Sequence, residues 1–377
     1  MLTYKGKYNS ANVMTDVVES ELVAQIYSFL NHPALEKGYI AVMPDCHWGN
    51  GTCIGFTKQM NEYIIPNMVG VDIGCGIESY NLGKIDINFY ELDHFIRENI
   101  PSGFNIRSKE IDNLGLYKSL INDIEDTCDL MSLDFAKVLK AIGTLGGGNH
   151  FIELDKAPNG NIWLTLHTGS RNFGLQVCNY HQKKAKELMN QMFIGDAYKG
   201  LEFLPLEFGG KEYLKHMHFA QQYAELNRHY IATRIIDFLK VPEVIWNIKT
   251  VHNYINFSDN IIRKGAISAK LHEEVLIPLN MKDGVIVGKG KGNAKWNFSA
   301  PHGAGRVLSR SKAKAQITLE QMKSDMEGIY SNSLSKDTID ESPSAYKDSQ
   351  FIIDAIGETV HINFVMKPIY NFKAGEK

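Results

Sequence analysis

The sequence predicts a mixed fold of the α/β or α+β class, in which one large domain covers residues 1–377 and a central mixed sheet region is flanked by helices. Three observations predict it. The chain has 377 residues, 44% hydrophobic and 22% charged, which is enough material for a large packed core. Two long stretches have helical periodicity, and several short apolar runs end in small residues, as buried strands do. Internal repeats and heptads are absent, and the most linker-like stretch, residues 331–344, is too short to separate two domains.

Two helices are expected, at residues 16–32 and 211–240. In the first, Asp16 is a candidate N-cap, and apolar residues recur every four positions: Val18, Leu22, Ile26 and Leu30. The second contains neither glycine nor proline, so it should form one long helix or two joined helices. Both helices should pack an apolar face against the core.

Three apolar runs are predicted to be buried strands: residues 68–75, 162–167 and 284–288. Each run ends in glycine, histidine or another residue suited to a loop. Loops carried on a rigid sheet are where chemistry is usually placed. The ends of these strands are therefore the first places to look for a site.

Composition limits the classes of function. No apolar run reaches the roughly 18 to 20 residues of a membrane-spanning helix, and the first residues lack the apolar region of a secretory signal, so a soluble cytoplasmic protein is expected. The five cysteines form no CxxC pair, which argues against a disulfide framework or zinc ribbon, and Cys128 and Cys178 are interpreted as buried small hydrophobes. With a net charge of −3, a nucleic-acid substrate would need a local basic patch.

Five segments pair glycine with a residue able to bind metal or phosphate: 43–49, 71–76, 143–150, 167–171 and 302–306. Glycine lets the backbone approach an anion closely and adopt positive φ. A single glycine-rich loop is usually a turn, so any one segment is a weak indication. Their number is what favours a phosphate-handling or metal-binding site.

Asp72 and Cys75 are three residues apart, so at a turn their side chains can converge on one point. Carboxylate, thiol and imidazole together suit manganese, iron or zinc, and the residue types do not decide between these metals. Among the thirteen histidines, four stand beside glycine, asparagine or the abrupt end of an apolar run: His150, His167, His252 and His302.

In residues 302–306 an imidazole is followed by glycines that leave room for a phosphate and by Arg306, whose guanidinium can hold one. A neutral histidine can attack phosphorus and form a covalent intermediate, which splits one difficult transfer into two easier ones. On the local sequence alone, a histidine in an ordinary glycine turn is the alternative.

Together and in this order, the segments resemble the RtcB family of RNA ligases from about Ile40 to the C-terminus. The resemblance is carried by nine collinear segments: MPDCHWGNGTCIG (43–55), VGVDIGCG (69–76), GTLGGGNHFIE (143–153), LHTGSRNFG (166–174), LNR (226–228), HNY (252–254), RKGAISA (263–269), HGAGRVLSR (302–310) and AYKD (345–348). Chance does not explain nine matches in sequence.

The resemblance implies two manganese ions per subunit, bridged by the cysteine. Cys75, His167 and His252 would surround one ion, and Asp72, Cys75 and His150 the other. A thiolate shared by two divalent cations is deprotonated outright, which explains why cysteine is wanted there.

The resemblance also implies that His302 is guanylylated by GTP, and that phosphates of RNA or nucleotide bind Arg171 and Arg306. The implied GTP-binding residues are Asn149, His150, Glu153, His302, Gly303, Ala304, Gly305, Arg306, Tyr346 and Lys373. The implied activity joins an RNA 3′-phosphate or 2′,3′-cyclic phosphate to a 5′-hydroxyl through histidine-GMP and an RNA-(3′)pp(5′)G end, in RNA repair or tRNA splicing. The expected partners are RNA ends and GTP, the protein is expected to be a monomer, and the need for an archease-type activator is left open.

Three departures from the family pattern indicate a divergent bacterial- or phage-type branch. Residues 277–284 lack a common Gly-Ser-Met-Gly stretch, Pro301 precedes the histidine, and Asn50 replaces a common lysine. Contacts to the triphosphate, the base or the RNA should differ accordingly. The alternatives are a nucleotidyltransferase that caps 3′-phosphate ends of RNA or DNA without efficient sealing, a non-catalytic RNA-end-binding repair protein, and a metal-dependent phosphodiesterase that needs no GTP.

Overall fold

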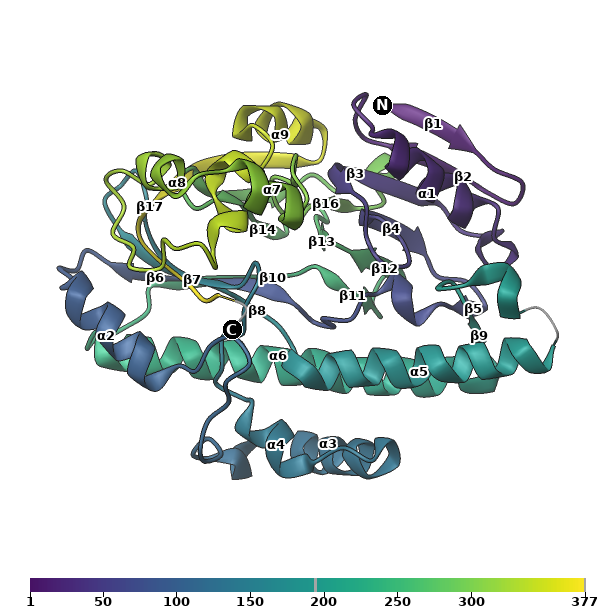
Figure 1. The fold of residues 1–377 in the computed structure, drawn as a ribbon, viewed down its shortest axis with the longest axis horizontal. Helices are drawn as coiled ribbons and strands as arrows, with labels where there is room; N and C mark the ends of the chain where they lie inside the picture. Colours follow the sequence, from purple (N-terminus) through teal and green to yellow (C-terminus); the bar gives the residue numbers. More distant parts are fainter. Residues whose placement is uncertain (193–194, 376–377) are drawn as a thin grey trace.

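The computed structural model describes residues 1–192 and 195–375, and two larger sheets form its centre (Figure 1). The seven-stranded sheet is antiparallel throughout. Its strands, in spatial order, are β10 (Trp246–Val251), β6 (Gly76–Gly83), β8 (Ile162–Thr168), β7 (Phe151–Lys156), β17 (Val360–Lys373), β15 (Gly284–Gly290) and β14 (Glu274–Asn280).

The six-stranded sheet is mixed, because β2 and β3 run parallel while its other neighbours are antiparallel. Its strands, in spatial order, are β1 (Leu2–Lys5), β2 (Ser10–Val13), β3 (Ile40–His47), β4 (Ile54–Gln59), β12 (Ile261–Lys264) and β11 (Asn253–Asn256). Two short pairs complete the strands: β13 (Ala266–Ser268) with β16 (Ser299–Pro301), and β5 (Tyr63–Ile64) with β9 (Leu204–Pro205).

Two long helices, α5 (Arg171–Gln191) and α6 (Lys211–Phe238), lie side by side below the sheets in Figure 1. Beyond them lie α3 (Lys118–Met131) and α4 (Phe135–Lys140), and α2 (Phe89–Asn99) lies near the C-terminal end of α6. The remaining helices lie on the opposite side of the sheets: α1 (Ser20–Leu30), α7 (Arg310–Gln316), α8 (Leu319–Asp325) and α9 (Ser349–Ala355). Among the described residues, no helix is both long enough and apolar enough to cross a membrane.

The mixed helix-and-sheet fold is confirmed, and so are several elements. The stretch 211–240 forms one continuous helix, α6, and the runs 162–167 and 284–288 form β8 and β15. The central sheet region consists of one mixed sheet beside one antiparallel sheet.

Two element predictions need correction. The first helix begins at Ser20 rather than near Asp16, because the side chain of Thr15 accepts a hydrogen bond from the Val17 backbone NH and forms a local turn. Residues 68–75 do not form a strand: Met68 ends a short 3-10 helix, and residues 69–75 form a loop in which Gly70 (φ 96°) and Gly74 (φ 72°) have positive φ. The strand β6 begins only after this loop.

Strand register brings loops distant in sequence to one end of the seven-stranded sheet. Val251 pairs with Gly76, Ile77 pairs with His167, and His167 also pairs with Phe151. Residues just outside these pairs must therefore meet at the same edge. Three of the predicted metal ligands, Cys75, His150 and His252, occupy such positions.

Candidate active site

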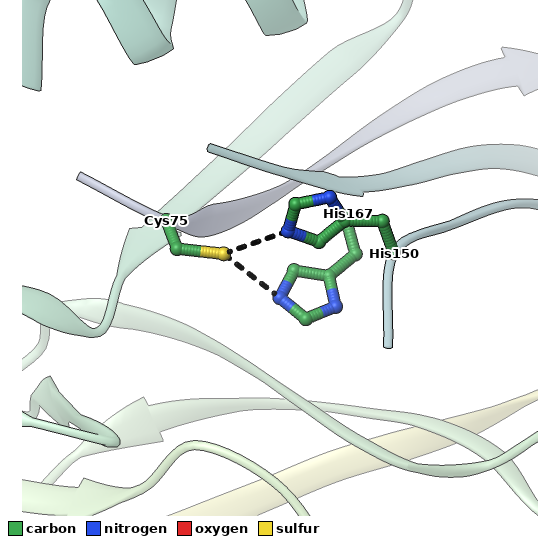
Figure 2. Close-up of side chains that lie close together, drawn as sticks. All are labelled: Cys75, His150 and His167. Atoms are coloured by element: carbon green, nitrogen blue, oxygen red, sulfur yellow. Dashed lines mark hydrogen bonds between the residues drawn. The ribbon is translucent and has the colours of Figure 1, made fainter. Parts of the chain in front are cut away.

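The cysteine and two of the histidines form a compact cluster of potential ligands. The sulfur of Cys75 lies 3.3 Å from Nε2 of His167 and 3.5 Å from Nε2 of His150. Figure 2 shows both rings turned toward the sulfur. These three ligand atoms lie within 4.8 Å of one another, and all three residues are buried.

The other two predicted ligands adjoin this cluster. Oδ2 of Asp72 lies 3.0 Å from Nε2 of His150, and Nε2 of His252 lies 3.3 Å from Nε2 of His167. The Asp72 carboxylate is held by the Ser170 backbone NH, which donates to its Oδ1 at 3.1 Å. The structure therefore brings together the five residues predicted from the sequence as metal ligands.

Hydrogen bonds fix how two of the rings are protonated. Nδ1 of His150 lies 2.9 Å from the Leu145 carbonyl oxygen, and Nδ1 of His167 lies 3.0 Å from that of Asn149. A carbonyl oxygen only accepts, so each Nδ1 carries a hydrogen, and in the neutral ring the lone pair is on Nε2. Burial also lowers the pKa of His167 and of His252 well below 6.5, so both rings are neutral at neutral pH.

This donor set fits a divalent cation. The Nε2 atoms of three imidazoles, a carboxylate oxygen and a sulfur lie in neighbouring pairs 3.0 to 3.5 Å apart, so a cation placed between them would have several ligand atoms within reach. Burial, followed by the charge of Asp72, raises the pKa of the Cys75 thiol well above its usual value. A metal ion would displace that proton.

His302 follows β16 and lies beside the cluster, with its ring centroid 4.8 Å from that of His252. Its Nδ1 lies 2.8 Å from Oδ2 of Asp45, and its backbone NH donates to the same oxygen at 3.2 Å. Asp45 is fully buried in β3. Because the carboxylate only accepts, the Nδ1 hydrogen points at Asp45, and in the neutral ring the lone pair of His302 is on Nε2.

A cavity of about 280 Å³ adjoins both His302 and the ligand cluster. Of the residues predicted to bind metal, nucleotide or phosphate, the following line it: Asp72, Cys75, Asn149, Glu153, His167, His252, His302, Gly303, Ala304, Gly305, Arg306, Tyr346 and Lys373. His150 lies behind this wall, in contact with Cys75 and Asp72.

One carboxylate organises the C-terminal wall of the cavity. Glu341 accepts hydrogen bonds from Arg310 at 2.7 Å, Tyr346 at 2.6 Å and Lys373 at 2.5 Å. Arg306 lies 3.2 Å from the same carboxylate. Burial by itself raises the pKa of Glu341, but the surrounding cations lower it to about 2. A buried anion thus fixes four side chains that line the cavity.

Glu153 lines the same cavity from β7, within electrostatic reach of Lys373. Asn371 donates to it at 2.6 Å. Burial, and then the neighbouring Asp155, raises the pKa of Glu153 well above its usual value. A carboxyl group that keeps its proton can both donate and accept hydrogen bonds.

Arg171 is separated from this cavity and lines a second groove of about 920 Å³ beside α5. Its guanidinium donates to Oγ1 of Thr144 at 3.2 Å and to the Gly103 carbonyl at 3.0 Å. Asp72 lines both hollows, so the groove meets the cavity at the ligand cluster.

Asp45 and Glu341 are not among the residues predicted from the sequence. Asp45 lies within the glycine-containing segment 43–49, where a carboxylate two residues before His47 could have indicated a functional role. Glu341 lies in the linker-like stretch 331–344, and the polar composition of that stretch gives no sign that Glu341 is buried. Only the fold shows that this stretch forms part of the cavity wall.

The departures at 277–284 also lie at the cavity, which Pro278, Leu279, Asn280 and Met281 line. Oδ1 of Asn280 accepts the backbone NH groups of Lys282 and Asp283, both at 2.9 Å, and so closes the turn between β14 and β15.

Comparison with known proteins identifies the family of the chain. The model of the family described as tRNA-splicing ligase RtcB matches residues 25–374. The RNA-splicing ligase RtcB of Escherichia coli (strain K12) is 30% identical over 390 residues, which cover 93% of this chain and 94% of that protein. The tRNA-splicing ligase RtcB of Methanococcus maripaludis is 28% identical over 427 residues, covering 91% and 88% of the two chains. The RNA-splicing ligase RtcB of Mycobacterium tuberculosis is 27% identical over 413 residues, covering 88% and 95%.

The family model spans nearly the whole described chain, from α1 to the end of β17, and so includes every strand and loop that carries a predicted site residue. The resemblance seen in nine sequence segments is thereby confirmed, and this chain belongs to the RtcB family.

Proposed function

We propose that the protein is an RNA ligase that uses GTP to join an RNA 3′-phosphate or 2′,3′-cyclic phosphate end to a 5′-hydroxyl end. The observation that carries the proposal is His302, whose Nε2 lone pair lies in the cavity beside the ligand cluster while Asp45 holds its Nδ1 hydrogen. This is the arrangement required of a neutral histidine nucleophile. Family membership supports the same activity.

In the proposed reaction, Nε2 of His302 attacks the α-phosphorus of GTP, and pyrophosphate leaves. The imidazole becomes positively charged during the attack, and the carboxylate of Asp45, 2.8 Å from Nδ1, stabilises that charge. An oxygen of the RNA 3′-phosphate then attacks the same phosphorus and displaces the histidine, which forms RNA-(3′)pp(5′)G. Finally the 5′-hydroxyl attacks the RNA phosphorus, a phosphodiester forms and GMP leaves.

Two manganese ions are proposed to bind the ligand cluster. Cys75, His167 and His252 would hold one, and Asp72, Cys75 and His150 the other. When bound, the ions would neutralise developing charge on the phosphates and orient them.

The cavity wall offers suitable contacts for the nucleotide. Asn149 and the glycines of residues 303–305 would approach the phosphates, and the wall held by Glu341 would present Tyr346 and Lys373 to the base or ribose. Glu153, whose pKa burial raises, would form hydrogen bonds with polar groups of the base. Arg171, in the adjoining groove, is proposed to bind phosphates of the RNA, and Arg306 those of RNA or nucleotide.

The choice of RNA ends tests the proposal directly. With Mn²⁺ and GTP, strands ending in a 3′-phosphate and a 5′-hydroxyl should be sealed, whereas a 3′-hydroxyl with a 5′-phosphate should not, because only a 3′-phosphate can accept GMP. The products are separated on denaturing gels. Sealing of the second pair would contradict the proposal, and accumulation of guanylylated ends without sealing would indicate a capping enzyme instead.

Asp45→Asn should slow formation of the protein–GMP adduct on the order of 100-fold or more. An asparagine amide can donate to Nδ1, which moves the ring hydrogen to Nε2 and removes the nucleophile's lone pair. Adduct formation from radiolabelled GTP measures the effect. The control is Asp86→Asn, the same change at an exposed position, which should behave as the wild type. Equal rates for both variants would refute the role of Asp45.

A further inference from the structure

The long helix α6 carries two adjacent polar residues that the proposed chemistry does not use. Asn227 is 0% exposed and Arg228 is 1% exposed, and neither lines the cavity. Burying an amide and a guanidinium is costly unless their donors and acceptors are satisfied. The groups to which they bond therefore indicate why they are there.

Asn227 joins two segments next to predicted metal ligands: the loop that ends at His150, and the residues that follow His167 at the end of β8. Its Oδ1 accepts the backbone NH of Gly143 at 2.7 Å and that of Thr144 at 3.1 Å. Its Nδ2 donates to the carbonyl oxygens of Thr144 and Gly169, both at 3.1 Å. The first loop leads to His150 at the start of β7, and the second leaves the end of β8.

Arg228 joins the loop that carries Asp72 and Cys75 to the end of β8. One of its terminal nitrogens donates to the Gly74 carbonyl at 2.8 Å and to the Thr168 carbonyl at 2.9 Å. Its Nε donates to Glu78 at 3.0 Å, so the buried cation has a buried anionic partner. Gly74 immediately precedes Cys75, so this contact bears on the position of the sulfur.

Close packing holds the same loops against the same helix. A Cβ atom at Gly74 would lie 2.8 Å from Cα of Gln221, and one at Gly143 would lie 2.6 Å from the ring of Tyr230. Both glycines have positive φ, 72° and 78°. The two loops therefore lie directly on α6, on either side of the Asn227–Arg228 pair.

We infer that Asn227 and Arg228 are positioning residues that preorganise the metal centre. They would hold the loop of Asp72 and Cys75, the loop that leads to His150, and the end of β8 just after His167 in place before an ion binds. These segments are distant in sequence, so bringing them together costs conformational freedom that ion binding would otherwise have to offset. Hydrogen bonds from one rigid helix to all three segments fix them beforehand. The inference rests on the proposed metal centre and goes beyond it.

Two conservative variants test the inference. Arg228→Lys keeps a cation beside Glu78 but lacks the forked group that also reaches two carbonyls. Asn227→Asp keeps the acceptor and replaces the donating amide with an oxygen that faces those carbonyls. Each should lower the affinity for Mn²⁺ about 10- to 100-fold, measured by titration calorimetry of the full chain. With Co²⁺ instead, each should shift or weaken the thiolate-to-cobalt absorption band of Cys75.

The matched control is Ile235→Ala, which removes a buried apolar side chain two turns further along α6. It should lower the melting temperature while leaving Mn²⁺ affinity and the cobalt spectrum as in the wild type. Wild-type affinity and spectrum in both Asn227→Asp and Arg228→Lys would overturn the inference. The same loss of affinity in Ile235→Ala would also overturn it, because general destabilisation would then explain the effect.

Amide hydrogen exchange of the metal-free wild type tests whether the loops are held in place before an ion binds, even where a variant fails to fold. The backbone NH groups of Gly143 and Thr144 should be as protected as the core of α6, because they donate to buried Asn227. Protection that appears only after Mn²⁺ is added would overturn the inference. If the wild type binds no Mn²⁺, the proposed metal centre is refuted. If the wild type and both variants bind Mn²⁺ equally well, only the proposed preorganisation is refuted.

Discussion

His302→Ala should form no protein–GMP adduct from GTP, and end joining should fall on the order of 10⁴-fold or more. The variant removes the imidazole nitrogen that faces the cavity, so the protein has no group there to which GMP can be attached covalently. Incubation with radiolabelled GTP and Mn²⁺, followed by denaturing electrophoresis, measures the adduct. In the wild type the adduct should be lost in acid and retained in alkali, as expected of a phosphoramidate.

The defect of His302→Ala should be chemical rather than structural. His302 is not one of the predicted metal ligands, and its half-buried side chain packs in a loop, so truncation should cost less than about 2 kcal/mol. Mn²⁺ binding should remain close to that of the wild type. RNA that already carries the RNA-(3′)pp(5′)G end should be sealed in part, because the histidine's step is bypassed. An acid-labile adduct in this variant would show that another histidine is the nucleophile.

Cys75→Ala should lower Mn²⁺ affinity by more than about 100-fold at both proposed sites, and activity should be lost with it. The sulfur lies 3.3 Å and 3.5 Å from nitrogens assigned to different ions, so its removal affects both sets of ligands. Metal content after dialysis against Mn²⁺, measured by plasma mass spectrometry, gives the result.

Cys178→Ala is the matched control for that experiment. Cys178 is equally buried, in α5, and belongs to the apolar core rather than to the ligand cluster. It should lose some stability but keep full metal content. Full occupancy in Cys75→Ala would show that the bridging assignment is wrong, and metal loss in both variants would show that the site responds to packing rather than to the thiolate.

The site could be predicted from the sequence wherever a residue's chemistry is visible in its own segment. Asp72, Cys75 and His302 stand beside glycines, and the fold brings them to one cavity. Glu341 could not be found in this way, because its importance comes from the four side chains that the fold brings around it: Arg306, Arg310, Tyr346 and Lys373. A buried carboxylate among cations is a property of the fold, and no local pattern marks it.

Helices and strands, like the site residues, were predicted correctly where local sequence specifies them. Apolar periodicity and the absence of glycine or proline predicted α6 correctly, because a helix is specified by local sequence. Residues 68–75 were mistaken for a strand since their apolar residues resemble one, while the positive φ of Gly70 and Gly74 is set by packing against other segments. The residues that pack against Gly70 and Gly74 come from distant parts of the chain, so the sequence around each glycine does not reveal them.

The place of β17 in the seven-stranded sheet has a consequence for folding. This strand, the last in the described sequence, lies between β7 and β15 and also carries Lys373 to the cavity. During synthesis, β7 and β15 emerge long before the strand that joins them, so the two halves of the sheet have unpaired edges until β17 inserts. A ribosome-bound chain that stops short of residue 360 would therefore lack both a continuous sheet and a closed cavity. Catalytic competence should therefore not appear before β17 has inserted.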